Sequence, residues 1–420
     1  MTAIVVLVFL LFFFLEYGVE TALLVLNLRH VAGAGGAVPP PLAGRIDAAT
    51  ALRSRDYTLA NGRLALVQGS YGALLTLAVL FSGLLPWLDG ALGSLRLGTA
   101  THFVAFLAIL SAVMALAGLP FGLYRTFVVE VRFGFNRTTF RLWLADRLKG
   151  LLLAGVLGIP LLYGVHAFMA RTGRLWWVWL FGFLTAFQVV MLWLYPALIA
   201  PLFNKFSPLA EGELRARLEG LARDAGFRNR GLFVMDASRR SGHSNAYFTG
   251  LFRPRIVLFD TLVERMTVDE AAAVLAHEIG HFKAHHVHRA LLLGLAGTLA
   301  GLWVVSLLVA WPPLFQAFGF AGPSFHATLA LLSLGGGAFT FFLSPVTAWL
   351  SRRHEYQADR FSVRLARAPE ALKAALVKLS GENLGNLHPH PWYSRWHYSH
   401  PTLLERLAAI DLAAGPGGAT

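Results

Sequence analysis

Residues 290–351 contain no Asp, Glu, Lys or Arg and read ALLLGLAGTLAGLWVVSLLVAWPPLFQAFGFAGPSFHATLALLSLGGGAFTFFLSPVTAWLS. A membrane-spanning helix needs about 20 predominantly apolar residues, so these 62 residues are long enough for two spans. The Gly- and Pro-containing segment at 318–323 predicts a turn between them. The stretch therefore predicts a hairpin of two transmembrane helices, whose two outer ends lie on the same side of the membrane.

Other uncharged stretches of similar length occur throughout the chain. Only 14% of the residues are charged and 56% are hydrophobic, whereas an ordinary soluble protein has roughly 25% charged residues. The first 28 residues are apolar and have no basic segment at their start, which distinguishes them from a cleaved signal peptide. Together these stretches predict five further spans, at about residues 1–28, 64–88, 97–124, 150–170 and 175–204. We therefore expect a mostly α-helical membrane protein with seven transmembrane helices.

The basic residues between these spans predict the orientation of the chain. Lys and Arg number 36 against 23 Asp and Glu, a net charge of +13. Loop 29–63 carries five basic residues and loop 125–149 carries six. The alternate loops carry fewer: one at residue 96, two at 171 and 174, and none in the hairpin turn. By the positive-inside rule the N-terminus lies outside, and the polar segments 203–288 and 351–420 face the cytoplasm. The basic residues are spread over several loops, so nucleic acid is not an expected partner.

The polar segment 203–288 changes from helical to strand-like pattern and back. Residues 211–225 form an amphipathic helix that ends at Gly226. Three short runs rich in β-branched and aromatic residues follow, which predict a small antiparallel sheet; they are residues 231–236, 245–250 and 255–260. Thr267, with Glu270 three residues later, is a plausible N-cap of an apolar helix that runs to about His288.

The last of these helices carries the sequence HEIGH, an HExxH zinc-protease pattern. His277 and His281 are four residues apart, so both imidazoles project from one helix face and can bind one metal ion. Glu278 lies beside them, within reach of a metal-bound water. The alternative is an exposed helix that happens to be His-rich. For the three further histidines, 285, 286 and 288, we favour a solvated or membrane-interfacial face.

A catalytic zinc usually has three protein ligands plus water, so one ligand is missing from HEIGH. The chain has no cysteine, which leaves His or a carboxylate. Glu355 follows the predicted hairpin directly, and the hairpin returns it to the level of His277 and His281. Asp359, one helical turn later, is placed to hydrogen-bond a ligating imidazole. The alternative for both carboxylates is ion pairing with the neighbouring arginines 352, 353 and 360.

Seven segments, in order, resemble signatures of the type I CaaX prenyl protease family, a group of integral-membrane zinc metalloproteases. They are VEVRFGFNRTTFRLWLADRLKG (129–150), PLFNKFSPL (201–209), LFVMDASRRSGHSNAYFTG (232–250), RIVLFDTL (255–262), HEIGH (277–281), EYQAD (355–359) and HPWYSRWHYSHPTLLERL (390–407). The resemblance implies a barrel of seven helices around a water-filled chamber. It also implies one Zn²⁺ per chain on the cytoplasmic side, bound by His277, His281 and Glu355.

The same resemblance implies roles for further residues. In the expected mechanism, Glu278 takes a proton from zinc-activated water and returns it to the leaving amine. His400 is the first candidate for a second donor to the tetrahedral oxyanion, although it is equally an interfacial structural residue. Residues 245–248 form an edge strand that pairs with an extended substrate, through Asn245, Ala246 and Tyr247. Read without the resemblance, this segment is only a short strand.

Glu16 and Glu20 lie one turn apart within the first predicted span. Ionisable residues inside a membrane usually face protein or water, so we expect the two carboxylates to line the chamber. The alternative is that both lie close enough to the membrane surface to be solvated.

These inferences divide the chain into four parts. Residues 1–202 hold spans one to five, 203–288 the catalytic segment, 289–350 spans six and seven, and 351–420 the C-terminal segment with the third zinc ligand. We expect a monomeric zinc metalloendopeptidase in the lipid bilayer that cleaves near the C-terminus of peptides or proteins, prenylated or not. The alternatives are a quality-control membrane metalloprotease and a non-enzymatic seven-helix scaffold. Only five of the 36 basic residues are Lys, which indicates a GC-rich genome. We therefore expect a bacterial inner membrane, or the endoplasmic reticulum membrane in a eukaryote.

Overall fold

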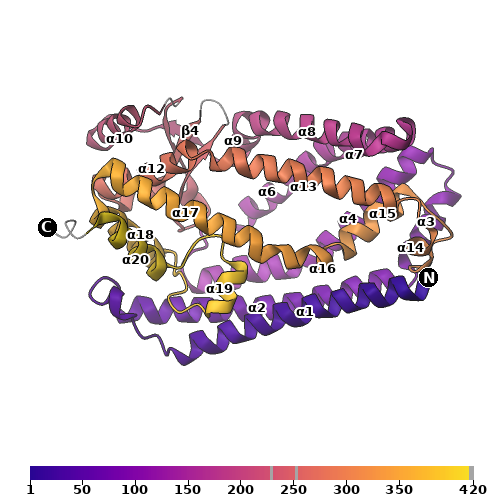
Figure 1. Ribbon diagram of the computed structural model, residues 1–420, viewed down its shortest axis with the longest axis horizontal. Coiled ribbons are helices and arrows are strands. Elements are labelled where there is room, and N and C mark those ends of the chain that lie inside the picture. The colour runs from indigo at the N-terminus through magenta and orange to yellow at the C-terminus, as the bar shows by residue number, and fades with distance from the viewer. Residues whose placement is uncertain (228–229, 251–253, 416–420) are drawn as a thin grey trace.

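The computed structural model describes residues 1–227, 230–250 and 254–415, and long helices dominate it (Figure 1). Among the described residues, six helical segments are long and apolar enough to cross a membrane: Thr2–Gly33, Ala48–Phe81, Thr99–Arg132, Phe140–Arg171, Gly173–Phe203 and His286–Leu308. A bent pair, Phe325–Gly335 and Gly337–Ala366, meets the same test as a unit, with an angle of 46° between its halves. Counted as one span, the pair brings the number to the predicted seven.

Most of the helices that form these spans and their connections are labelled in Figure 1. They are α1 (Thr2–Gly33), α2 (Ala48–Phe81), α3 (Leu84–Ser94), α4 (Thr99–Tyr124), α5 (Glu130–Arg132), α6 (Phe140–Leu153), α7 (Ile159–Arg171), α8 (Trp176–Leu194), α9 (Ala200–Phe203), α13 (His286–Leu308), α14 (Pro312–Gln316), α15 (Phe325–Gly335), α16 (Gly337–Thr340) and α17 (Ser344–Ala366). Short π-helical turns interrupt three of the long segments, at 125–129, 154–158 and 195–199.

The bend in the last span coincides with three consecutive glycines, residues 335–337. Glycine costs a helix backbone entropy and permits a kink. It also permits close packing here, because a Cβ on Gly335 would lie 3.0 Å from the ring of Phe9 in α1. The glycine run therefore both bends the span and lets the first helix pack tightly against it.

The largest apolar core lies at the end of the molecule that carries α3, α14 and α15 (Figure 1). Phe103 and Phe106 of α4 and Phe315 of α14 are almost completely buried there. Burying such a side chain contributes about 1.5–3 kcal/mol. This core holds the connections between spans two and three and between spans six and seven against each other.

A second core, at the opposite end, surrounds a four-stranded sheet. Its strands are β1 (Phe206–Pro208), β2 (Leu232–Met235), β3 (Ala246–Thr249) and β4 (Arg255–Phe259), in the order β1-β2-β4-β3. The predicted antiparallel sheet is wrong in one respect: β2 and β4 are parallel, with Val234 opposite Leu258. The chain crosses over between them, and β3 turns back to pair with the outer side of β4, so β3 is an edge strand. The sequence also did not predict β1.

Two of the helices around this sheet were predicted from the sequence: α10 by its range, and α12 by its N-terminal cap. α10 (Glu213–Asp224) lies within the predicted range and precedes Gly226, whose φ is +56°. α12 (Val268–Lys283) begins with the predicted cap: the amide of Glu270 donates to Thr267 Oγ1 (3.3 Å), and the amide of Thr267 donates to a carboxylate oxygen of Glu270 (2.8 Å). α11 (Asp260–Arg265) connects β4 to this helix.

The predicted end of α12 at about His288 is wrong. The helix ends at Lys283, and His285 adopts a left-handed conformation with φ of +56° before α13 begins at His286. A left-handed residue cannot continue a right-handed helix, so α12 and span six are separate elements.

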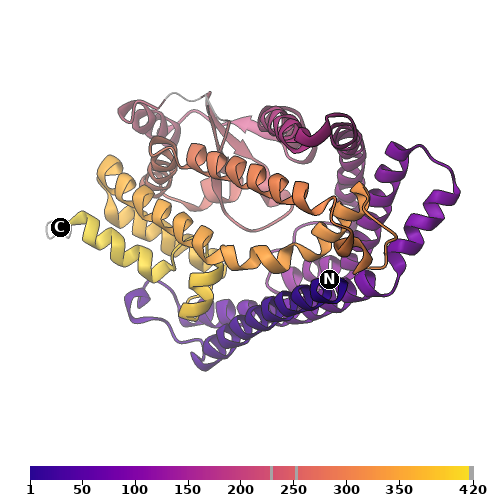
Figure 2. The ribbon, with the colours of Figure 1, turned by 45° about the vertical axis from the view of Figure 1, so that its right-hand side comes forward.

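The segment after span seven folds back over the same end of the molecule. It contains α18 (Pro369–Glu382), α19 (Pro391–His397) and α20 (Leu403–Ala414). Figures 1 and 2 show α17 running beside α12. α18 packs against both of these helices, and α20 packs against α17 and α18. Residues far apart in the sequence therefore meet at the junction of α12, α17 and α20.

Candidate metal centre

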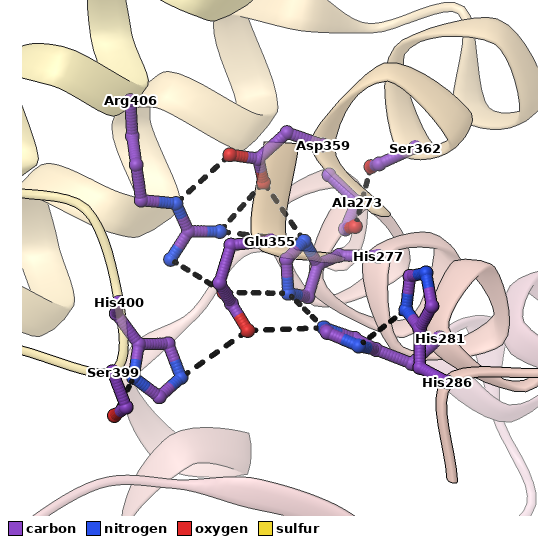
Figure 3. A network of polar contacts seen from close by, with 10 residues as sticks. All are labelled: Ala273, His277, His281, His286, Glu355, Asp359, Ser362, Ser399, His400 and Arg406. Carbon is purple, nitrogen blue, oxygen red and sulfur yellow. Dashed lines mark hydrogen bonds and ion pairs between the residues drawn. The ribbon is translucent and has the colours of Figure 1, made fainter. Parts of the chain in front are cut away.

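Two helices bring the three predicted metal ligands together. α12 supplies His277 and His281, and α17 supplies Glu355 (Figure 3). The Nε2 atom of His281 lies 3.2 Å from Glu355 Oε1, and that of His277 lies 3.5 Å from Oε2. The two Nε2 atoms are 3.1 Å apart. All three side chains thus offer a ligand atom within 4.8 Å of one another, as a single metal ion requires.

The close approach of the two helices depends on Gly280. A Cβ at this position would lie 3.0 Å from the Cα of Ala358 and 3.1 Å from the Cβ of Phe361. Any larger residue would have to push α17, and Glu355 with it, away from α12. The glycine of HEIGH therefore sets the distance between the histidines and the carboxylate.

An ion pair of Asp359 and Arg406 lies at the Nδ1 side of His277. Its Nδ1 donates to Asp359 Oδ1 (2.8 Å), and Arg406 of α20 binds both oxygens of that carboxylate, at 2.6 and 2.9 Å. The Asp359 side chain is only 1% exposed, so the guanidinium is what compensates its buried charge. A hydrogen bond at Nδ1 leaves Nε2 free for a metal. The sequence interpretation included Asp359 but missed Arg406, whose place beside the site depends on the packing of α20.

His286 supports the second ligand in a similar way. Its Nε2 lies 2.8 Å from the amide oxygen of Gln357, an acceptor, so Nε2 carries the proton and the Nδ1 of a neutral ring is an acceptor. That Nδ1 lies 3.0 Å from Nδ1 of His281, which must therefore donate and leave its own Nε2 free. The expectation of a solvated or interfacial face is wrong for His286, which is buried and stacks on His354. The break after α12 is what turns it inward.

The local charges change the pKa values of two residues on α12. Burial alone would lower the pKa of His277, but the carboxylates of Asp359 and Glu355 outweigh it and raise the pKa to about 9. A divalent cation in the same place would replace this proton, because a ligating imidazole is neutral. Burial raises the pKa of Glu278, against the opposing charges of the two histidines. A carboxylate with a raised pKa is a better proton acceptor near neutral pH.

His400 lies on the open side of the cluster. Its Nε2 is 3.4 Å from Glu355 Oε1, and its Nδ1 is 3.0 Å from the hydroxyl of Ser399 (Figure 3). The side chain is 63% exposed, so a molecule bound at the cluster could contact it. The structure thus brings His400 next to a candidate ligand from the loop between α19 and α20.

The predicted substrate strand is β3, which lies at the sheet edge. Ala246 packs into the core shared with α12, while Tyr247 faces the other side of the sheet, where its hydroxyl lies 3.8 Å from Met235 Sδ. Asn245 is exposed and caps the strand through its own side chain, which accepts from the amide of Ala246 (2.8 Å). Any pairing with an extended peptide would use the backbone of β3, since Tyr247 points away from α12.

The two carboxylates of α1 differ in their surroundings. Glu20 Oε2 lies 3.3 Å from Nε2 of His397 in α19, so this carboxylate faces protein. Glu16, one turn earlier in α1, is partly exposed.

Comparison with known proteins places this arrangement in a family. Residues 27–205 match the family model described as CAAX prenyl protease N-terminal, five membrane helices, and residues 208–414 match peptidase family M48. The chain is 38% identical over 383 residues to CAAX prenyl protease 1 homolog of Oryza sativa subsp. japonica, covering 89% of this chain and 90% of the relative. It is 36% identical over 404 residues to CAAX prenyl protease 1 of Saccharomyces cerevisiae, covering 89% and 88%.

A solved structure shares the whole fold. The crystal structure of S. mikatae Ste24p matches with a TM-score of 0.90 and 32% identity, over 97% of this chain and 99% of that one. The fold and the site define a multi-pass membrane metalloprotease. The chain belongs to peptidase family M48 and carries the N-terminal membrane region of the CAAX prenyl proteases. The family resemblance and the metalloprotease activity expected from the sequence are therefore confirmed.

Proposed function

We propose that this protease binds one zinc ion per chain through His277, His281 and Glu355. The observation that carries the proposal is the convergence of these three side chains from α12 and α17. Two features fit a metal better than hydrogen bonding alone. The ring nitrogens of the two histidines face each other at 3.1 Å, and Glu355 Oε2 is buried without a hydrogen-bond partner. Nitrogen and carboxylate ligands in this number are typical of a catalytic zinc site.

The residues around the ligands then divide the work of peptide hydrolysis. A zinc ion bound there supplies Lewis acidity to water and to the scissile carbonyl. Glu278 accepts the proton of the attacking water and passes it to the leaving amine. His400 donates a hydrogen bond to the oxyanion from the open side. Asp359, with Arg406, and His286 hold the two ligating rings in the tautomer that leaves Nε2 free.

The substrate we propose is the C-terminal end of a peptide or protein with a CaaX sequence, cleaved at a bond near that end. The support for this substrate is that the relatives, which match over most of this chain, are named CAAX prenyl proteases. The β3 edge, at Asn245, Ala246 and Tyr247, supplies backbone groups for an extended substrate.

The proposal includes a topology. We infer that residues 203–288 and 351–420 form a cytoplasmic catalytic region, and that residues 1–202 and 289–350 form a membrane barrel around a chamber lined by Glu16 and Glu20. The basic loops 29–63 and 125–149 support this orientation. We further propose that the chain is a monomer in a bacterial inner membrane or, in a eukaryote, in the endoplasmic reticulum membrane.

A cleavage assay with the purified full-length chain tests the function. Three peptides that differ only in the CaaX cysteine would be compared: prenylated Cys, free Cys, and Ser in its place. We expect cleavage near the C-terminus of the first or the first two, measured by mass spectrometry, and its loss after metal removal with recovery on adding zinc. Equal cleavage of all three peptides at internal sites would contradict the CaaX specificity and favour a quality-control protease.

A further inference from the structure

A second cluster of two histidines and one carboxylate lies at the other end of the long helices. It consists of Asp89 in α3, His102 in α4 and His326 in α15. Figure 1 shows these three helices meeting at the end of the molecule opposite α12 and α20. The catalytic ligands belong to α12 and α17, so the two clusters share no residue. The proposed protease function does not use the second cluster.

The geometry of this cluster resembles a ligand set more than an ordinary ion pair. Nε2 of His102 lies 2.7 Å from Asp89 Oδ1, and Nε2 of His326 lies 2.8 Å from the same oxygen. The two imidazole rings are 4.8 Å apart and inclined by 34°. All three ligand atoms thus fall within 4.8 Å of one another, although they come from three helices. A carboxylate oxygen can accept two hydrogen bonds, so the observation that points to a metal is the convergence of three ligand atoms from three helices.

The cluster packs against a buried aromatic ring on one side and is partly exposed on the other. The ring of His326 packs 4.8 Å from Phe106, which is fully buried. The side chains of Asp89, His102 and His326 remain 31%, 16% and 14% exposed, so an ion in solution can reach them. An apolar shell around a metal site limits ligand motion and lowers the local dielectric, which strengthens binding.

A further polar group is fixed beside His326. The hydroxyl of Ser324 lies 3.2 Å from its Nε2 and also accepts from the amide of Ala327 (3.2 Å), capping α15. The start of α15 is therefore held in one conformation, and His326 sits in its first turn. A ligand at this position requires little ordering when an ion binds.

We propose that Asp89, His102 and His326 bind a second divalent transition-metal ion, with zinc the best match for two imidazoles and one carboxylate. The ion would join α3, α4 and the start of α15, and so tie the connection between spans two and three to the turn between spans six and seven. It is a structural site at the membrane face opposite the protease centre.

Metal content of the full-length protein in detergent tests this proposal. In a His277→Ala/His281→Ala background, which removes the catalytic site, we expect about one zinc per chain after zinc loading and desalting. Adding His102→Ala and His326→Ala should reduce this to near zero. His166→Ala is the matched control: it removes an imidazole that packs on Phe103 and Phe325 at the same end, and should leave zinc content unchanged.

A second measurement, the effect of zinc on the melting temperature, distinguishes loss of zinc binding from misfolding of these variants. Asp89→Asn preserves the shape of the side chain and removes only its charge. We expect zinc to raise the melting temperature of the His277→Ala/His281→Ala protein, and Asp89→Asn in that background to abolish the shift. The proposal is overturned if the background protein retains no zinc, or if zinc shifts both proteins equally. A melting temperature that depends on pH but not on zinc would identify the cluster as a proton-linked ion pair only.

Discussion

The two ends of the molecule carry clusters of the same composition, two histidines and one carboxylate, built in different ways. In the catalytic cluster both histidines lie on one helix, four residues apart, and buried partners surround them. In the second cluster each residue comes from a different helix and all three are partly exposed. We propose different roles for the two clusters, and their supporting residues are what distinguish them.

The supporting residues differ most in charge. Asp359 and Arg406 form a buried pair behind His277, and Glu278 lies next to that ligand on α12. The described contacts of Asp89, His102 and His326 are with one another, with Ser324 and with aromatic rings, and include no further carboxylate. We propose that the first cluster holds an ion and moves a proton, and that the second only holds an ion.

Glu278→Gln should give the largest effect, because it removes the proton acceptor that distinguishes the catalytic cluster. General acid–base catalysis contributes about 10²–10⁴-fold, so we expect peptide cleavage to fall by that factor. Zinc content should stay at the parental level, since Glu278 is not a proposed ligand. Cleavage at the parental rate would contradict the proposed role of this carboxylate.

Disruption of the buried pair should have the next largest effect. Arg406→Leu leaves Asp359 buried without its counter-charge, and Asp359→Asn weakens the hydrogen bond that orients His277. Loss of such outer partners costs about 10–100-fold in metal affinity or activity. Zinc affinity, measured by competition with a chelator, should fall in both variants. Arg364→Leu is a surface control on α17, and unchanged affinity in Arg406→Leu would show that the pair is merely structural.

Gly280→Ala tests whether the helix spacing sets the catalytic geometry. The added methyl group would meet the backbone of Ala358 at 3.0 Å, and such overpacking costs about 1–3 kcal/mol. We expect a lower melting temperature together with reduced cleavage, because Glu355 moves with α17. Gly294→Ala, in open space on α13, is the matched control. A variant with full activity would mean that α17 adapts without moving Glu355.

Glu270→Gln should give the smallest effect, and one that depends on pH. Burial alone would raise the pKa of Glu270, but Lys378 and the amide of Thr267 hold it below its usual value. The stabilisation is thus fully present above the unfolded pKa of about 4.3 and is lost as the pH falls through the lower folded pKa. We expect Glu270→Gln to cost about 1 kcal/mol at neutral pH.

Thermal unfolding of the parent and Glu270→Gln at a series of pH values measures this difference. The two melting temperatures should converge as the medium becomes acidic. A constant difference across the series would show that Glu270 acts through packing and not through its charge.

The spans were predictable because they depend on local composition. The 62 uncharged residues between Arg289 and Arg352 required a hairpin, and the hairpin returned Glu355 to the level of HEIGH. The parallel pairing of β2 and β4 was not predictable, since the antiparallel expectation assumed that neighbours in sequence pair in the sheet. The end of α12 was also missed, because nothing in the residue type of His285 requires a positive φ.

Prediction of site residues from the sequence had the same limit: local spacing identified some of them, and tertiary packing placed the rest. His277 and His281 were recognisable because helical periodicity fixes their relation, and Asp359 because it lies one turn after Glu355. Arg406 and His286 gained their positions from the packing of α20 and the break before α13, which no local pattern encodes. Asp89, His102 and His326 are separated by 13 and 224 residues and meet only in the folded chain.

The division of the catalytic centre between α12, α17 and α20 also controls when it exists during synthesis. His277 and His281 leave the ribosome before spans six and seven, whereas Glu355 follows them and Arg406 comes last. The site therefore cannot be completed until the final hairpin has been inserted, because chains are made from the N-terminus. The proposed site is thus incomplete in the nascent chain until α20 has been synthesised.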